Sequence, residues 1–161
     1  METKHTNFPT PPWDMEIAAE RLVFEETAWN SHEPDIILQG YADNIEMRDG
    51  VDFITSKQEL RQFLKRKFER HLDFTLKLDL WGALKGRMAV RFEAEWRDAS
   101  GQWYRDYGVQ VFQFNDHGYV ERRLPVRRQL ALRNRPGNSS QTLKRPQDSD
   151  FFRPMGSLVL C

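Results

Sequence analysis

Apolar residues recur at helical spacing in the first part of the chain. Between Asp14 and Asn30 they return every three or four positions, with charged residues such as Arg21 and Glu25 between them. This pattern predicts an amphipathic helix whose charged side chains point outward. Asp14 has the side chain of a helix N-cap, and after a break Pro34 suits the first turn of a second helix.

The next segments continue this helical part. The second helix is expected over residues 35–41 and an extended segment over 45–48, before an Asp-Gly turn at 49–50. A third helix is expected over 56–71, because it opens with the Ser-x-x-Glu pattern of a capping box and keeps an apolar stripe at helical spacing.

From Leu72 onward the apolar period changes from helical to alternating, which predicts half-buried β-strands. Four strands are expected, over residues 72–80, 88–97, 102–115 and 119–128. The turns between the last three contain Asp, Asn, Ser and Gly, the residues that favour tight turns. Three helices followed by a meander of strands predict an α+β fold.

The length of 161 residues fits one domain. We expect a flexible lead-in over residues 1–12, the folded domain over 13–130, and a disordered tail over 131–161, where no period is sustained. The end of the chain is basic, since residues 127–161 hold seven Lys or Arg and two Asp.

Composition restricts the partners of the protein. The formal net charge is zero, so we expect neither nucleic acid nor a membrane surface as a partner. No apolar run approaches the roughly 18 residues of a membrane span. The only cysteine is Cys161, which rules out a disulfide within the chain and favours a cytoplasmic location.

Several short strings in this order resemble one known superfamily. They are Ala28-Trp29-Asn30, Tyr41-Ala42-Asp43, Trp81, Val90-Arg91-Phe92, Glu95-Trp96, Gly101-Gln102-Trp103, Tyr107-Gly108, and Gly118 through Arg122-Arg123. Together they are similar to a branch of the nuclear transport factor two-like fold near the SnoaL-like polyketide cyclases, over roughly residues 12–124.

The resemblance implies a cone-shaped fold with three N-terminal helices packed on a curved, mostly antiparallel sheet and a small-molecule pocket between them. Members of the superfamily include isomerases, cyclases, dehydratases and epoxide hydrolases that use no cofactor, and also non-catalytic binding proteins. After Tyr107-Gly108 the branch typically carries polar residues, whereas this chain has Val109 and Val111. A second departure is the stretch Leu124-Pro125-Val126-Arg127-Arg128, which stands where the branch continues with small and polar residues.

The faces of the sheet follow from hairpin geometry. If the turn over 98–101 is a four-residue loop, paired residues have numbers that sum to 199, and Trp96 lies opposite Trp103. Arg105 and Tyr107 then join Trp96 on the face that the helices cover. The same rule at the turn over 115–118 places Arg122 on that face, opposite Val111.

Buried arginines need a carboxylate or an anionic ligand. Glu46, Asp49 and Arg48 come from the segment that usually forms one wall of the pocket in this fold. We therefore expect Asp49 or Glu46 to act as general acid or base, and Arg105 or Arg122 to stabilise an oxyanion or enolate. The alternative is that these groups form internal salt bridges.

The opposite face would carry Glu93 directly across from Asp106, either a carboxylate pair with a raised pKa or part of an outer, solvated or dimer-facing surface. Six residues are candidates for contact with the substrate. They are Trp29, Tyr41, Arg48, Trp96, Trp103 and Tyr107. The four histidines have no metal-ligand spacing, and neither a phosphate-binding loop nor a nucleophile elbow is present, so we expect no metal or cofactor.

These observations favour a cofactor-independent isomerase, cyclase or hydrolase that acts on an apolar, oxygenated metabolite such as a polyketide or terpenoid. Epoxide opening is one such reaction. The alternative is a non-catalytic, dimeric small-molecule binding protein, and in both cases we expect a homodimer.

Overall fold

The computed structural model describes residues 9–133. Its elements follow one another as α1 (Met15–Asn30), α2 (Pro34–Leu38), β1 (Tyr41–Asp49), β2 (Asp52–Ile54), α3 (Lys57–Arg70), β3 (Leu72–Leu84), β4 (Arg87–Arg97), β5 (Trp103–Phe114) and β6 (Val120–Leu132). Three helices and a curved, mostly antiparallel sheet are therefore confirmed. Strand β6 includes residues 131 and 132 of the expected tail over 131–161, and residues 134–161 lie outside the described residues.

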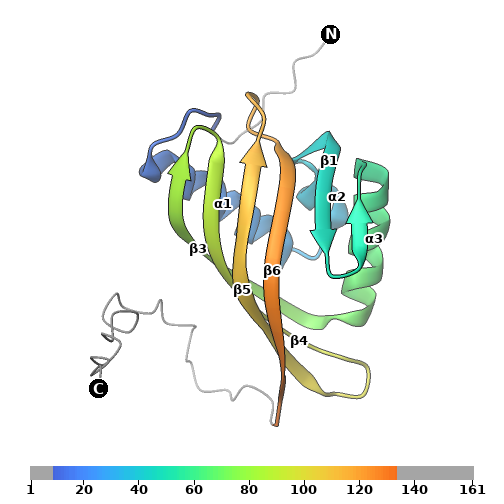
Figure 1. The fold of residues 1–161 in the computed structure, drawn as a ribbon. Helices are drawn as coiled ribbons and strands as arrows, with labels where there is room; N and C mark the ends of the chain where they lie inside the picture. Colours follow the sequence, from blue (N-terminus) through green and yellow to red (C-terminus); the bar gives the residue numbers. More distant parts are fainter. Residues whose placement is uncertain (1–8, 134–161) are drawn as a thin grey trace, which may run out of the picture.

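The six strands form one sheet in the order β2-β1-β6-β5-β4-β3. Neighbouring strands are antiparallel except β1 and β6, which are parallel. Figure 1 shows the long strands curving, with α1 lying across one face of the sheet and α3 beside the β1–β2 hairpin. The face covered by the helices is called the inner face below.

The helix starts follow the sequence signals. The Asp14 carboxylate accepts a hydrogen bond from the Ile17 backbone N–H at 2.9 Å. The Ser56 hydroxyl accepts one from Glu59 at 3.2 Å, while the Glu59 carboxylate accepts one from the Thr55 backbone N–H at 2.7 Å. These are the bonds of N-caps, which satisfy N–H groups that have no partner within the helix.

Three segments differ from the expected pattern. Helix α2 ends at Leu38, so Tyr41 belongs to strand β1. The short strand β2 was not anticipated, and it separates α3 from the other helices. Arg21 and Glu25 of α1, expected to face outward, are buried. They occupy the inner side of α1 because they bond each other and nearby groups rather than water.

The pairing of β4 with β5 differs by one residue from the expected register. Trp96 lies opposite Tyr104, because the loop has three residues between Asp98 and Gln102, whose backbones also pair. Gly101 has φ +88°, the left-handed conformation that ends this kind of loop. A shift of one residue moves every side chain of β5 to the other face.

The expected register of β5 with β6 is also wrong. Arg122 lies opposite Gln113 rather than Val111, and the register shifts between Gln113 and Phe114. Gly118, with φ +80°, closes a second three-residue loop. The outer face of β5 and β6 is consequently the one that carries Arg122 and Val111.

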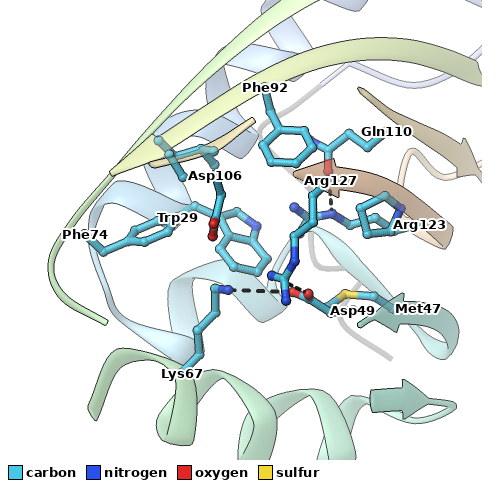
Figure 2. Close-up of a pocket in the computed structure, with 13 residues that line it drawn as sticks. Trp29, Met47, Asp49, Lys67, Phe74, Phe92, Asp106, Gln110, Arg123 and Arg127 are labelled. Carbon is cyan, nitrogen blue, oxygen red and sulfur yellow. Dashed lines mark hydrogen bonds and ion pairs between the residues drawn. The ribbon is translucent and has the colours of Figure 1, made fainter. Parts of the chain in front are cut away.

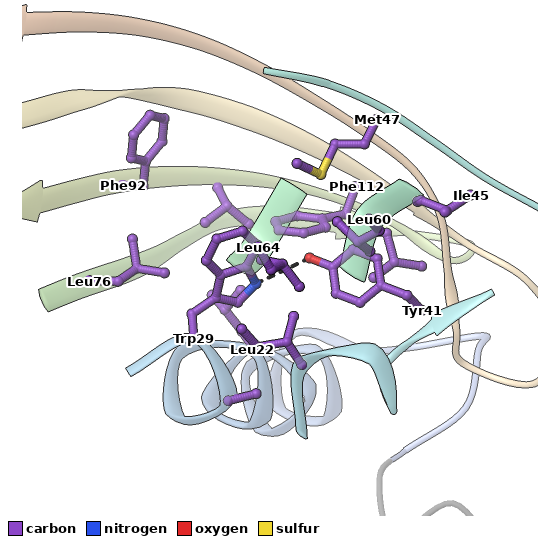
Figure 3. Packing of buried hydrophobic residues seen from close by; sticks show 14 of the residues in the cluster. Leu22, Trp29, Tyr41, Ile45, Met47, Leu60, Leu64, Leu76, Phe92 and Phe112 are labelled. Carbon is purple, nitrogen blue, oxygen red and sulfur yellow. Dashed lines mark hydrogen bonds between the residues drawn. The ribbon is translucent and has the colours of Figure 1, made fainter. Parts of the chain in front are cut away.

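The core fills the space between the inner face and the helices (Figure 3). Its largest fully buried apolar side chains come from α1, α2, β1, α3, β4 and β5, and they are Trp29, Ile37, Tyr41, Ile45, Met47, Leu60, Leu64, Met88 and Phe112. Removing such surface from water is the main stabilising contribution to a fold of this kind.

A close approach of β5 and β6 gives a test of this packing. A Cβ added at Gly108 would lie 2.0 Å from the Val126 carbonyl oxygen, whereas one added at Gly82 has no neighbour within 4 Å. We expect Gly108→Ala to lower the free energy of unfolding by about 2 kcal/mol or more, as overpacking does. Gly82→Ala should change it by less than about 0.5 kcal/mol. Urea unfolding of the two variants measures this, and equal stability of both would contradict the described register.

Candidate functional site

A small cavity lies between the inner face of the sheet and helices α1 and α3 (Figure 2). Its volume is about 30 Å³. The walls combine apolar side chains with a cluster of charged ones, and the lining residues are Trp29, Met47, Asp49, Lys67, Phe74, Leu76, Phe92, Ala94, Asp106, Gln110, Arg123, Pro125 and Arg127. It is called the inner pocket below.

Asp49, at the end of β1, connects three elements at the edge of the inner pocket. Its Oδ1 lies 2.7 Å from Arg127 NH1 of β6, and its Oδ2 lies 3.6 Å from Lys67 Nζ of α3. Figure 2 shows the two cations meeting at this carboxylate. The close contact to Arg127 makes the guanidinium the principal partner of the Asp49 charge.

Asp106 of β5 points into the same pocket and is 3% exposed. Its Oδ2 accepts a hydrogen bond from the Trp96 indole N–H at 3.0 Å, whereas its Oδ1 has no hydrogen-bond partner. Burial raises the pKa of the Asp106 carboxyl, and the nearby Asp49 carboxylate adds to this, against Trp96, Arg127 and Lys67. A protonated Asp106 is therefore favoured more than for a carboxyl in water.

Arg123 of β6 forms the opposite wall. Its Nε donates to Gln110 Oε1 at 2.9 Å, and its NH1 donates to the Tyr41 hydroxyl at 3.2 Å. The guanidinium lies 4.3 Å from the centre of the Trp29 ring. Gln110 Nε2 is buried without a partner. The pocket thus holds an unused acceptor on Asp106 and an unused donor on Gln110, which a bound molecule can satisfy.

Behind Arg123 lies a buried network centred on Glu25. This carboxylate accepts hydrogen bonds from the Tyr41 hydroxyl, from Trp29 Nε1 at 2.8 Å and from Arg21 NH1 at 3.3 Å. Burial raises the pKa of Tyr41, so its hydroxyl stays protonated. The network keeps a buried carboxylate paired and fixes the side chains next to the pocket.

A second hollow of about 180 Å³, called the outer hollow below, adjoins the inner pocket. Both are lined by Asp49, Lys67 and Arg127, so this ion cluster lies where the two meet. The other residues of the outer hollow are Asp52, Phe63, Arg66, Arg70 and His71. The larger hollow therefore adjoins the inner pocket at these charges.

Four of the residues expected at a site lie at or next to the inner pocket. Asp49 and Trp29 line it. The Trp96 indole N–H donates a hydrogen bond to Asp106, and the Tyr41 hydroxyl accepts one from Arg123. The structure therefore brings these four together through direct hydrogen bonds or a shared cavity.

The other expected catalytic residues lie elsewhere. Glu46 and Arg122 face outward and pair with each other at 2.8 Å, each about half exposed. Arg105 lies on the outer face and pairs with Glu95 of the neighbouring strand. The predicted approach of Arg105 and Arg122 to an inner concavity is wrong, because the register moves both to the outer face.

Three expected substrate contacts are also outside the pocket. Trp103 and Tyr107 lie on the outer face, for the same reason as Arg105. Arg48 is exposed and lies 5.9 Å from the centre of the Phe53 ring. The expected register placed Asp106 on the outer face, opposite Glu93. In the structure it lies on the inner face, opposite Ala94.

Sequence reasoning did not place five polar residues in the inner pocket: Lys67, Gln110, Arg123, Arg127, and Asp106, which it assigned to the opposite face of the sheet. Lys67 had a signal, since it interrupts the apolar stripe of α3 as a cation at a core-facing position. The signal for the others was the glycine at the third loop position of each hairpin, which favours three-residue loops and sets the register.

Among residues 9–133, no group of three or more His, Cys, Asp or Glu side chains is arranged to hold a metal ion. Within the same range, no helix is long and apolar enough to cross a membrane.

The chain matches the family described as "Protein of unknown function (DUF1348)" over residues 11–136, and it belongs to that family. A search of curated proteins finds no match. The fold is nuclear transport factor two-like, as the structural comparisons below establish.

Three solved structures illustrate the similarity. The epoxide hydrolase/cyclase-like enzyme SalBIII, described as acting in pyran ring formation in the polyether salinomycin, is 17% identical with a TM-score of 0.65 and covers 74% of this chain and 98% of its own. An NTF2-like protein of unknown function from Exiguobacterium sp. is 15% identical (TM-score 0.60; 67% and 98% covered). RV0760c from Mycobacterium tuberculosis, in complex with estradiol-17beta-hemisuccinate, is 13% identical (TM-score 0.60; 67% and 91% covered).

The outer hollow yields a prediction about acid stability. His71 stacks on Trp96 with ring centres 3.8 Å apart, and burial, with Lys67 and Arg127 nearby, lowers the pKa of His71 to about 3 from 6.5. Between these values the unfolded chain binds a proton at this residue that the folded protein does not. The free energy of unfolding therefore falls as the pH drops from 6.5 towards 3.

We expect His71→Phe, which keeps an aromatic ring against Trp96, to lose less stability than the wild type over this pH window. Urea unfolding at several pH values compares the two proteins. Both contain the same carboxyl groups, so a difference in their pH dependence comes from residue 71. An identical pH dependence of both would show that His71 is not held neutral in the folded state.

Proposed function

We propose that the protein is a small-molecule enzyme that opens, isomerises or cyclises an apolar, oxygenated metabolite by acid–base catalysis and without a cofactor. Asp106 is the general acid and Asp49 the general base. The observation that carries this proposal is the pair of unlike carboxyl groups in one apolar-walled pocket, one buried with an unused oxygen and the other paired with cations.

The different surroundings of Asp106 and Asp49 give the two carboxyl groups different roles. Burial raises the pKa of Asp106, which keeps a proton available for transfer to a substrate oxygen. Asp49 instead lies 2.7 Å from Arg127 and 3.6 Å from Lys67, so its surroundings differ from those of Asp106. Pairs of carboxyl groups in unlike surroundings supply the acid and base of many enzymes.

Epoxide opening illustrates the chemistry. Asp106 gives its proton to the epoxide oxygen as a C–O bond breaks, and a water molecule forms a new C–O bond while its proton passes to Asp49. The product is a diol, and the proton returns from Asp49 to Asp106 through water. If a hydroxyl group of the substrate replaces the water, the same proton transfers close a cyclic ether.

The walls of the pocket suit an apolar molecule with few oxygens. Trp29, Phe74 and Phe92 offer aromatic surface, and Arg123 supplies a charge for an oxyanion that develops during the reaction. The inner pocket is small, so it takes the reactive, oxygen-bearing end of the substrate, and the outer hollow of about 180 Å³, which is lined mainly by charged side chains, adjoins it. The reaction named for SalBIII belongs to the same chemical class, which supports the proposal.

Asp106→Asn and Asp49→Asn are each expected to lower kcat for hydrolysis of an apolar epoxide such as cyclohexene oxide by about 10²- to 10⁴-fold, because each removes one proton-transfer group. Activity of the wild type should also fall as the pH rises through the raised pKa of Asp106, since only the protonated form donates. Product formation measured by chromatography over a pH series tests both points.

The matched control is Glu93→Gln, which makes the same carboxyl-to-amide change on the outer face of the adjacent strand. It should leave kcat unchanged.

If a panel of epoxides and unsaturated ketones raises the melting temperature of the wild type but no product forms, the protein is a binding protein instead. Val109 and Val111, which stand where the family branch typically carries polar residues, face outward and lie outside the pocket.

We also propose that the outer face of β5 and β6 joins two copies of the chain in a homodimer. It exposes Val109, Val111, Leu124 and Val126, which are neighbours across the two strands. An exposed apolar patch of this kind on a sheet favours association, because burying it removes apolar surface from water.

Val126→Glu is expected to convert the dimer to a monomer, since it places a charge in the centre of this patch, where Val126 is 72% exposed. Val23→Glu, at a 65% exposed position of α1, is the matched control and should leave the dimer intact. Sedimentation velocity at micromolar concentration measures both variants, and a monomeric wild type would rule the dimer out.

A further inference from the structure

Lys67 lies where the inner pocket and the outer hollow meet, and it lines both. Its side chain is 9% exposed. The other lysines among residues 9–133 are all more exposed, and they are Lys57, Lys65, Lys77 and Lys85. A long cationic side chain usually keeps its ammonium group in water, so a lysine amine held in this position needs a physical reason.

The contacts of Lys67 do not supply a full counter-charge. Its Nζ lies 3.6 Å from Asp49 Oδ2, whereas Arg127 approaches the other oxygen of the same carboxylate to 2.7 Å. The Asp49 charge is therefore neutralised mainly by Arg127. The amine itself lies 5.7 Å and 5.8 Å from the ring centres of Phe63 and Phe74, which is within the range of cation–π contacts but adds no counter-ion.

The charges that face Lys67 come from α3, β1, β5 and β6. Burial is the largest influence and lowers the pKa of Lys67, with Arg127 and Arg123 lowering it further, while Asp49 and Asp106 raise it. His71, one turn along α3, is itself neutral near pH 7. A lowered pKa increases the share of the uncharged amine at a given pH, and this is the nucleophilic form of lysine.

We propose that Lys67 is an imine-forming lysine that condenses with aldehydes and ketones reaching it from the outer hollow. The nitrogen lone pair adds to the carbonyl carbon, and a proton passes from this nitrogen to the carbonyl oxygen to give a carbinolamine. A further proton, taken up from water, lets this oxygen leave as a water molecule and gives the iminium ion. The neutral lysine amine, the carbonyl compound and one proton are therefore the reactants, and the iminium ion and water are the products.

The neighbouring carboxylate extends this chemistry. An iminium ion acidifies the C–H bonds next to its carbon, and Asp49 lies on the side of the pocket where it can accept such a proton. Removal of the proton gives an enamine, and its return regenerates the iminium ion, which water hydrolyses back to the carbonyl compound. The net result is exchange of hydrogen next to the carbonyl group.

The direct test is to trap the imine in the whole wild-type chain. The protein is treated near neutral pH with acetone and a limiting amount of sodium borohydride, and isopropylated lysines are identified by peptide mass spectrometry. Each unit by which the pKa is lowered gives about tenfold more free amine near pH 7, so Lys67 should be modified faster than exposed lysines. Lys65, on the same helix and exposed, is the internal comparison.

Labelling spread over the exposed lysines, with Lys67 modified no faster than Lys65, would overturn the proposal. The distribution of modified lysines in the wild-type protein decides this, so no variant is needed. A Lys67→Met variant, with folding checked by circular dichroism, should lose only the fast modification, and exchange of acetone hydrogens in heavy water should fall to the rate without protein.

Two variants distinguish a site tuned by its neighbours from an amine that is merely accessible. Arg127→Met removes a cation that lowers the Lys67 pKa and should move the pH midpoint of labelling upward. Asp49→Asn removes a carboxylate that raises it and should move the midpoint downward. Unchanged midpoints in both would contradict the proposal.

The imine does not depend on the acid–base reaction proposed above. Asp106→Asn removes the general acid of that reaction but should leave fast labelling of Lys67 in place. Failure of epoxide turnover and failure of imine trapping are therefore separate results.

Discussion

The left-handed backbone of Gly101 is the constraint on which the site depends. It closes a three-residue loop between β4 and β5 and thereby sets which side chains of β5 face the helices. Asp106 and Gln110 lie inside for this reason, and Arg105 and Tyr107 lie outside. A loop longer by one residue would reverse the two sets, because successive side chains of a strand point to opposite faces.

Buried charge shapes the other side of the pocket. Arg21 and Glu25 are paired across one turn of α1, and Glu25 is further bonded by Trp29 and Tyr41. Tyr41 in turn receives a hydrogen bond from Arg123, so the wall of the pocket is connected to the middle of α1. Such a network is stable only when each member has partners, which ties the pocket wall to the packing of the helix.

The ion cluster at Asp49 lies between the small inner pocket and the larger hollow outside it. It brings together the end of β1, the last turn of α3 and strand β6, which are far apart in the sequence. The arrangement gives Asp49 a close cation and leaves Lys67 loosely paired beside two phenylalanine rings. The same geometry therefore underlies both the proposed base and the proposed imine-forming lysine.

Local patterns in the sequence determined the elements: the caps at Asp14 and Ser56, the alternation after Leu72, and a fold resemblance that the structure confirms. These depend on neighbouring residues, so they can be read from the chain itself. The faces of the strands, the burial of Arg21 and Glu25, and the meeting of Asp49 with Lys67 and Arg127 were decided only by the tertiary structure. The reason is that each depends on a one-residue register or on a partner distant in sequence, and neither changes the hydrophobic pattern from which elements are predicted.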